Sequence, residues 1–466
     1  MRTFQKGPGR GIFFISLLLA TVLFGFAAKR EQEVTRKAMS PALVQFIKQK
    51  RALTEVLAEK HQIKTPGAVW TFFNAAERGD WLATSNLYRA LTAHSENGVS
   101  ELPRPLAAPL KETVGAFEQF ETSEAELLKK FAGQIIDDLP ADSIYFGGTD
   151  AGRFVVSAFC QSHTQGRPFF TVTQNALADW TYLDYLRDIY GRKLSIPTPE
   201  EAQQAFQDYL QDAQRRLASK QLKEDEEISL VEGKAQVSGT VAVMQINERL
   251  LKRLIEKNPS HEVFIEESFP LESLNARYLP HGLVLKISRE PVERLPDSVI
   301  EKDHQFWTAE VRSLIGSSLK EAASIPQLCA TLEAIYVRSD ESAFDGNRAY
   351  LKDTQAPQYF SKCRSSIARV YQWRSQNARK SDAAALINEA DFAHRQAYAL
   401  APFNAEEAWL YSSFLLEQKR TNDAKAILAT TLKINPSKSE EFNAHYFTNS
   451  LAKLRKKAQE LDVKTR

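Results

Sequence analysis

The sequence predicts an α/β domain followed by an all-α domain, carried on an N-terminal membrane helix. Three observations predict this: an uncharged apolar segment at residues 11–28, short apolar strands that alternate with helices between residues 111 and 297, and the fading of strand patterns over residues 298–466. Short strands separated by helices favour a central, mainly parallel sheet with flanking helices. At 466 residues the chain is long enough for two or three domains with their own cores.

The first apolar segment, GIFFISLLLATVLFGFAA, follows three basic residues and has 18 uncharged positions. That length lies at the lower end of what spans a bilayer as a helix. A cleavable signal peptide is the alternative, because the end of the segment loosely fits the small-x-small rule, but the hydrophobic part of such a peptide is usually shorter. The sequence favours an uncleaved signal anchor over residues 1–30, with the remainder of the chain exported.

Two helical segments are expected before the sheet. Residues 31–64 have the pattern of a polar helical stalk that leads away from the membrane. Residues 65–110 predict a helical hairpin and a Pro-rich linker, in which Gly79 suits the left-handed end of the first helix and Asp80 can cap the second. The segment ELPRPLAAPL, at residues 101–110, is interpreted as that linker or a rigid turn.

Residues 111–297 carry the alternating pattern of the α/β domain. The expected strands are SIYF, PFFTVT, HEVFIEE and GLVLKIS, with AQVSGTVAV as a further apolar segment. The expected helices between them are AELLKKFAGQII, GRFVVSAFCQ, LADWTYLDYLRDIYG and NERLLKRLIEKN. The aromatic residues of LADWTYLDYLRDIYG also suit sugar stacking, but a buried helix face is the favoured use.

The last domain, residues 298–466, is expected to be helical with tetratricopeptide-like repeats at about 371–438. Residues 405–438 have the 34-residue length of such a repeat. Three pairs of residues lie 34 positions apart: Ala390 and Ala424, Ala397 and Thr431, and Pro402 and Pro436. Because fewer than three repeats make a short solenoid, we expect them to pack on the preceding helices. Stacked helix pairs present grooves suited to peptides, which predicts a protein partner.

Composition excludes several classes of function. The net charge is +2, because 60 basic residues nearly balance 58 acidic ones, so nucleic acid is not an expected partner. The cysteines, Cys160, Cys329 and Cys363, form no CxxC pair and have no zinc-type spacing with histidines. We interpret them as buried small hydrophobes, with one disulfide as the alternative. We predict no metal and no cofactor.

The segment SIYFGGTDAGRF, residues 143–154, raises the question of what its Gly-Gly turn holds. It lacks the Gly-Lys-Ser/Thr of a phosphate loop and the GxGxxG spacing of a dinucleotide site. A tight turn with Thr149 or Asp150 capping a helix explains most of it. Arg153 is not needed by that explanation, and a helix N-terminus with an arginine beside it can hold an anionic group.

A second strand adds polar residues to this region. If residues 143–148 and 168–173 are parallel neighbours, the residues that follow them meet at the carboxyl edge of the sheet, where open α/β sheets bind ligands. Glu266 and Glu267 can join that edge, but adjacent strand residues point to opposite faces, so only one of them should face it. The candidate ligand-binding residues are Thr149, Asp150, Arg153, Gln174, Asn175 and Glu267. No residue is nominated as catalytic.

The segments IYFGGTDAGRFVVSAF, RPFFTVTQNALADWTYLDYLRDIYG, QVSGTVAVMQIN, VFIEESFPL and LPHGLVLKISREP together resemble an uncharacterised family of bacterial single-pass, membrane-anchored tetratricopeptide-repeat-like proteins. Their order also looks like the soluble extracytoplasmic domain of protein O-mannosyltransferase-related membrane proteins. The resemblance covers roughly residues 65–300. It implies a place in the bacterial inner (cytoplasmic) membrane with the bulk of the chain periplasmic. Such transferases have many membrane helices, whereas this chain has one hydrophobic segment, so that activity is not expected of it alone.

The function expected from these features is that of a membrane-anchored extracytoplasmic adaptor that binds a protein partner through its helical repeats. The alternative is a glycan-binding or glycosyltransferase-accessory protein at the outer face of the membrane. A free-standing hydrolase is not supported, because the chain has no GxSxG, no Cys-His pairing and no HExxH motif.

Overall fold

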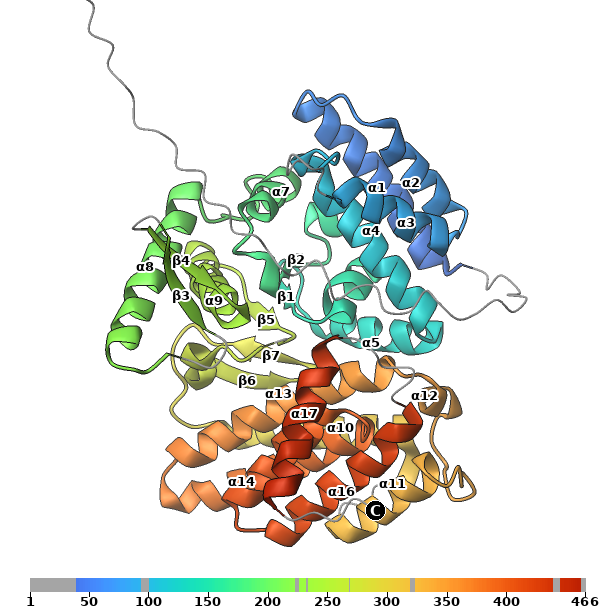
Figure 1. Ribbon diagram of the computed structural model, residues 1–466, viewed down its shortest axis with the longest axis vertical. Helices are drawn as coiled ribbons and strands as arrows, with labels where there is room; N and C mark the ends of the chain where they lie inside the picture. Colours follow the sequence, from blue (N-terminus) through green and yellow to red (C-terminus); the bar gives the residue numbers. More distant parts are fainter. Residues whose placement is uncertain are drawn as a thin grey trace, which may run out of the picture.

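The computed structural model describes residues 39–93, 100–222, 226–231, 234–267, 269–318, 323–438 and 445–461. The predicted membrane segment, residues 11–28, lies outside these ranges. Within them, none of the helices has both the length and the apolar character needed to cross a bilayer. The fold is mostly helical and is built around one small mixed sheet, with N-terminal and C-terminal helices on two sides of it (Figure 1).

Five helices form the N-terminal layer. They are α1 (Pro41–Lys60), α2 (Gly67–Glu77), α3 (Trp81–Thr92), α4 (Arg104–Thr122) and α5 (Ala125–Asp138). Helix α1 is not a free polar stalk, because Leu43, Phe46 and Ile47 are buried and the helix packs along α4. Apart from the buried Lys50, its charged residues are exposed or half-buried on the outer face, and they give the segment the pattern of a solvated helix.

The hairpin of α2 and α3 is confirmed, with its expected turn. Gly79 has φ +71°, which favours glycine, and the Asp80 carboxylate accepts the Ala83 N–H at 3.0 Å. The Pro-rich segment is not a linker, since α4 already begins at Arg104. Its first-turn proline is tolerated because the N–H groups there have no helical partner, and Pro109 follows inside the helix.

The sheet has five strands in the order β2-β1-β5-β7-β6. They are β1 (Ile144–Gly147), β2 (Phe170–Thr173), β5 (Val263–Ile265), β6 (Tyr278–His281) and β7 (Val284–Ile287). β1 pairs in parallel with both β2 and β5, whereas β7 runs antiparallel to β5 and β6. The sheet is therefore mixed rather than mainly parallel, because the β6–β7 hairpin completes it without a crossover helix.

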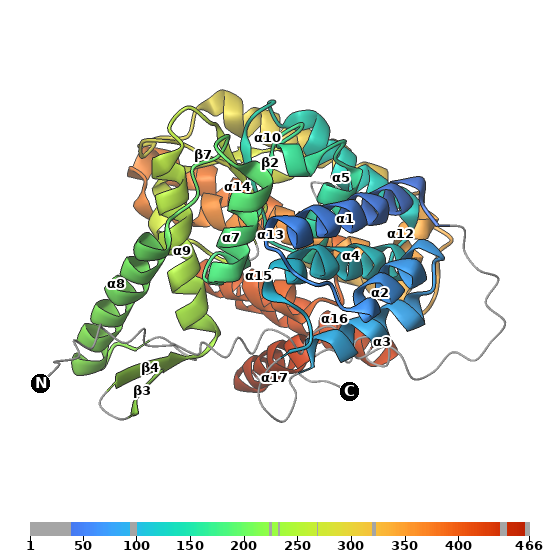
Figure 2. The same cartoon turned by 90° about the horizontal axis from the view of Figure 1, so that it is seen from above.

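Two connections of different length flank β1. A π-helical turn (Ala151–Val155) and α6 (Val156–Phe159) lead to β2. The chain then returns to β5 on the other side of β1 through the following elements: α7 (Trp180–Tyr190), α8 (Pro199–Ala218), the hairpin of β3 (Glu227–Val231) and β4 (Lys234–Ser238), and α9 (Thr240–Lys257). Figure 2 shows α8 and the β3–β4 hairpin projecting from the body.

The C-terminal region is helical, as predicted. Its helices are α10 (Asp297–Ile315), α11 (Ile325–Tyr336), α12 (Arg348–Lys352), α13 (Ala356–Asn377), α14 (Lys380–Leu400), α15 (Ala405–Glu417), α16 (Thr421–Lys438) and α17 (His445–Glu460). Short loops pair α13 with α14 and α15 with α16.

The 34-residue offset is reproduced in part. Ala390 and Ala424 are both buried, as are Ala397 and Thr431. Pro402 follows the end of α14, but Pro436 lies inside α16 and does not end it. As expected, these helices pack on the preceding part of the chain, and α13 contacts β6 and β7. The three cysteines are buried and unpaired, so no disulfide forms.

Candidate functional site

The carboxyl ends of three parallel strands form one edge of the sheet. The expectation that residues 143–148 and 168–173 are parallel neighbours is confirmed, with Gly147 opposite Thr173. β5 lies on the other side of β1 and ends beside them, with Ile265 opposite Phe146. The polar residues that follow the three strands therefore approach the same edge. The connection that follows β1 runs to β2 on one side, and the next connection returns to β5 on the other side. This edge therefore includes the topological switch point of the sheet.

The Gly-Gly turn holds a carboxyl group of the chain itself. Oε2 of Glu266 accepts the N–H groups of Gly148 and Thr149, each at 2.7 Å. Glu266 is 1 % exposed, and burial raises its pKa although both N–H groups oppose this. A Cβ at Gly152 would lie 2.0 Å from Oε2, so only glycine allows this approach. The loop has the geometry of an anion-binding turn, and Glu266 occupies it.

Glu267 points the other way, as the alternation of side chains on a strand requires. Its carboxylate accepts from Arg369 of α13 at 2.6 Å, and from the Tyr278 hydroxyl and the Leu271 N–H at 3.2 Å each. These contacts join the sheet to the C-terminal helices. Glu267 is therefore not brought to the cluster of the other nominated residues, and its neighbour Glu266 is the residue at the Gly-Gly turn.

Three of the nominated side chains do come together. Arg153 donates through Nε to Oδ1 of Asp150 at 2.9 Å and through Nη1 to Oδ1 of Asn175 at 3.1 Å. The Arg153 side chain is 14 % exposed and that of Asp150 is 40 % exposed, so solvent reaches the group. Thr149 and Gln174 contact other groups: Oγ1 of Thr149 accepts the Gly152 N–H, and Gln174 donates to the Phe269 carbonyl.

Helix α4 adds two charged residues to this edge that sequence reasoning did not nominate. Lys111, Gly115 and Glu118 lie on one face of α4, at positions i, i+4 and i+7. A Cβ at Gly115 would lie 2.2 Å from the Phe154 ring, so the helix passes closely over the turn that carries Arg153. In the sequence, the only indication of this close approach is the spacing of two charged residues around a glycine on an otherwise apolar helix face.

Lys111 is a cation beside another cation. Burial and the charge of Arg153 lower its pKa, and the charges of Asp179, Asp150 and Glu112 act in the opposite direction. Among the residues that the structure describes, Lys111 makes no hydrogen bond and has no carboxylate within ion-pair distance. It differs in this from Arg153, which is paired with Asp150.

Glu118 lies at the same edge as a neutral acid. Burial, together with the charge of Asp150, raises the pKa of Glu118 to about 8, although Arg153 and Arg89 oppose this shift. Its Oε2 is buried and has no hydrogen-bond partner within the described ranges. At neutral pH this carboxyl group is mainly protonated and can donate a hydrogen bond.

Two tyrosines complete the edge. Burial raises the pKa of Tyr88 to about 12, and Arg153 is near enough to oppose the shift. The Tyr182 oxygen accepts the Thr173 N–H at 2.7 Å, which leaves its own O–H to donate. We define the edge cluster as Lys111, Glu118, Asp150, Arg153, Asn175 and Tyr182.

A second, buried cluster lies between α1, α4 and α7. It comprises Lys50, Glu112, His163 and Tyr185. The Lys50 ammonium pairs with Glu112 and lies 2.5 Å from Nε2 of His163 and 3.0 Å from the Tyr185 oxygen. The Tyr185 hydroxyl also donates to Glu112 at 2.8 Å.

The charges of the buried cluster are balanced internally. Burial acts to raise the pKa of Glu112, but the charge of Lys50 and the contacts with His163 outweigh it and lower that pKa to about 2. Burial and the charge of Lys50 lower the pKa of His163 to about 4, so its ring is neutral at pH 7. The cluster therefore holds α1 against the rest of the fold.

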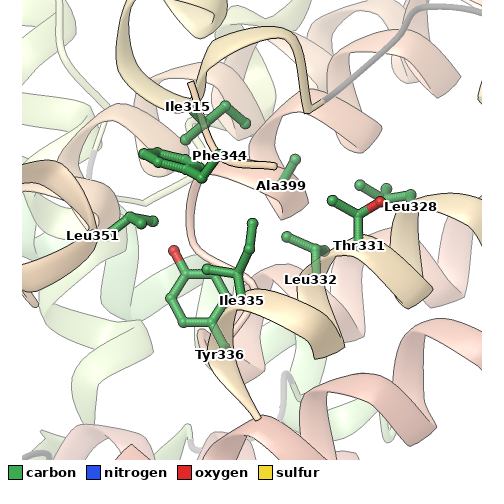
Figure 3. A pocket seen from close by; sticks show the side chains of 9 residues that line it. All are labelled: Ile315, Leu328, Thr331, Leu332, Ile335, Tyr336, Phe344, Leu351 and Ala399. Carbon is green, nitrogen blue, oxygen red and sulfur yellow. The ribbon is translucent and has the colours of Figure 1, made fainter. Parts of the chain in front are cut away.

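A cavity between α10, α11, α12 and α14 is too small for a ligand. Figure 3 shows its lining, which is apolar apart from the hydroxyl groups of Thr331 and Tyr336. Its volume is about 10 Å³, which is the room that a single water molecule needs.

Comparisons with protein families, with curated proteins and with solved structures find no match for this chain. The resemblance stated above therefore stays a prediction. The geometry of the edge cluster is what supports a function.

Proposed function

We propose that the edge cluster binds a small anion, a carboxylate or a phosphate monoanion, between Lys111 and Arg153. The observation that carries the proposal is the pair of neighbouring cations, one of which has no counter-ion among the described residues. Two like charges at close range destabilise each other, and a bound anion removes that cost. Charge-assisted hydrogen bonds to an anion are also the strong ones.

The surrounding groups suit the same ligand. The positive charge of Arg153 acts on both Glu118 and Lys111, and that of Arg89 acts on Glu118. Glu112 is also near Lys111, but Lys50 balances its charge. The protonated Glu118 carboxyl, the Asn175 amide and the Tyr182 hydroxyl supply neutral donors beside the two cations.

Calorimetric titration of the full-length protein with acetate and with inorganic phosphate tests this proposal. We expect Lys111→Met to weaken binding by about tenfold or more, because a charge-assisted hydrogen bond contributes roughly 1.5–3 kcal/mol. Lys129→Met is the matched control, since Lys129 is an exposed lysine of α5. Equal affinities of the wild type and Lys111→Met for both anions would reject the site.

A second candidate is the membrane-anchored extracytoplasmic adaptor, favoured by the paired helices α13–α16. The inner helix α13 is already used against the sheet, so a partner would reach α15, where Trp409 is 39 % exposed beneath Lys457 of α17. Affinity capture from solubilised membranes with the wild type and with Trp409→Ala compares this surface directly. An unchanged set of recovered proteins would count against it.

The place of the chain in the inner membrane is part of this second proposal and has its own test. Cells that produce the full chain or the chain without residues 1–30 can be fractionated. We expect only the full chain to resist alkaline extraction from membranes. Extraction of both forms would contradict an uncleaved anchor.

A further inference from the structure

Building on the proposed anion site, we infer that its ligand is an acidic sugar: the carboxylate lies between Lys111 and Arg153, and the pyranose ring stacks on Trp180. A free carboxylate or phosphate would use only the cations. The exposed aromatic ring beside them distinguishes a sugar acid from a simple anion.

Trp180 departs from the burial of the rest of its helix. It is the first residue of α7 and is 54 % exposed, whereas Leu183, Tyr185, Leu186 and Tyr190 of the same helix are buried. The interpretation of this aromatic segment as a buried face therefore fits those four residues and not Trp180. The guanidinium of Arg104 lies 5.3 Å from the Trp180 ring centroid and fixes the ring from α4.

Trp180 is connected to the edge cluster through the packing of α7 on α4, the helix that carries Lys111 and Glu118. Asp179, which precedes it, is near enough for its charge to act on Lys111. Oδ1 of Asp179 accepts from the N–H and the hydroxyl of Thr181, at 2.9 and 2.7 Å, so the start of α7 is held in place. Asn175 lies five residues before Trp180 on the same connection from β2.

The chemistry of this edge matches the two sides of a sugar acid. A pyranose presents C–H groups on its face and hydroxyl groups around its rim, and an indole ring packs on such an apolar face. Asp150 and Asn175 carry oxygens that accept hydroxyl hydrogen bonds, while Lys111 and Arg153 take the carboxylate.

A protein partner fits this position less well than a sugar. The centre of a protein interface is typically apolar and depleted of charged residues. The other large apolar side chains found exposed in the described ranges do not belong to α7 or to the sheet edge: Val56, Leu82, Leu217, Val337 and Trp409. Trp180 is thus a single aromatic platform among polar groups.

The experiment titrates the full-length protein with D-glucuronate, D-glucose and acetate, using the wild type, Trp180→Ala and Lys111→Met. We expect glucuronate to bind between about threefold and tenfold more tightly than acetate, which is the range of an added aromatic contact. Trp180→Ala should remove that difference and leave acetate binding unchanged, and Lys111→Met should weaken both. Trp409→Ala, an exposed tryptophan of α15, is the control and should change neither.

The outcomes separate this inference from the proposed function. Equal affinities for glucuronate and acetate, unaffected by Trp180→Ala, would overturn the acidic sugar and leave the anion site standing. Binding of glucose as tight as that of glucuronate would overturn the role of the carboxylate. Binding of none of the three probes, nor of phosphate, would overturn the anion site itself. Circular dichroism of each variant checks that it is folded.

Discussion

Two neighbouring residues of α4 serve clusters of opposite character. Glu112 belongs to the buried cluster, in which Lys50 contacts Glu112, His163 and Tyr185. Lys111 belongs to the edge cluster and has no counter-ion within the described ranges. Both clusters combine a lysine, a glutamate and a tyrosine. The comparison teaches that ionisable residues alone do not indicate a binding site; the proposal depends on a charge that has no partner among the described residues.

The largest expected effect comes from breaking the buried cluster. Lys50→Met leaves Glu112 without its counter-charge, which should cost about 3–5 kcal/mol in the free energy of unfolding. Lys111→Met should change it by less than about 1 kcal/mol, because no ion pair is lost. Urea denaturation measures both. Adding Glu112→Gln to Lys50→Met should recover part of the loss, and similar losses for Lys50→Met and Lys111→Met would erase the distinction between the clusters.

A smaller effect on unfolding free energy is expected at the Gly-Gly turn. This turn is intermediate between the two clusters, because it has the geometry of an anion site but is filled by a carboxyl group of the chain. In Gly152→Ala the new methyl group would lie 2.0 Å from Oε2 of Glu266 and must displace the carboxyl from the N–H groups of Gly148 and Thr149. We expect a loss of about 1–3 kcal/mol in unfolding free energy. Gly133→Ala in α5 is the control: a Cβ there meets nothing within 4 Å, so a gain of roughly 0.5–1 kcal/mol is expected. Equal changes in both variants would rule out a tight fit at Gly152.

The buried cluster should also make stability depend on pH. The pKa of His163 is lowered from 6.5 to about 4, so the unfolded chain binds this proton first, and stability present above pH 6.5 is lost as pH falls towards 4. Glu112, lowered from 4.5 to about 2, extends the loss below pH 4.5. Denaturation at pH 7.5, 5.5 and 4.5 measures the first part. His163→Gln should reduce the dependence of stability on pH in this range. A stability that increases as pH falls from 6.5 to 4 would contradict the assignment.

The smallest effect is expected for the edge cluster, where protonation should change binding instead. As pH rises through about 8, Glu118 ionises and repels a bound anion, so affinity should fall by about threefold to tenfold. The charged groups around Glu118 are Asp150, Arg153 and Arg89, and Lys111 shares its helix face. Acetate titration at pH 6.5 and 9 measures the change. Glu118→Gln should retain its affinity at pH 9; an equal decline in the variant would place the titrating group at Lys111.

Much of the central fold was accessible from the sequence. The apolar strands that end at Gly147 and before Gln174 were predicted from their local pattern, and their parallel pairing was a supposition that the structure confirms. Strand β6 was missed because it is short and contains Pro280, which weakens a strand pattern. The packing of α1 was missed because its buried lysine, Lys50, looks solvated unless its tertiary partners are known.

The site was predictable only where it depends on strand order. Asp150, Arg153 and Asn175 were placed together because the carboxyl ends of parallel strands meet. Lys111 and Glu118 come from a helix that precedes the sheet in the chain, and no local pattern shows that α4 crosses over Arg153. The alternation of side chains along a strand predicted that Glu266 and Glu267 point to opposite faces. It did not predict which of the two would bind the Gly-Gly turn.

Glu267 also bears on how the chain can be divided. Glu267 pairs with Arg369 of α13, and Arg374 of α13 donates to the carbonyls of Ala276 and Tyr278. These contacts connect the sheet to α13 across the domain boundary expected at residue 297. In a fragment of residues 1–297, Glu267 would lose Arg369 as its counter-ion. This side chain is only 5 % exposed in the whole protein. We expect the two halves to melt in one transition, and neither to survive as a stable fragment.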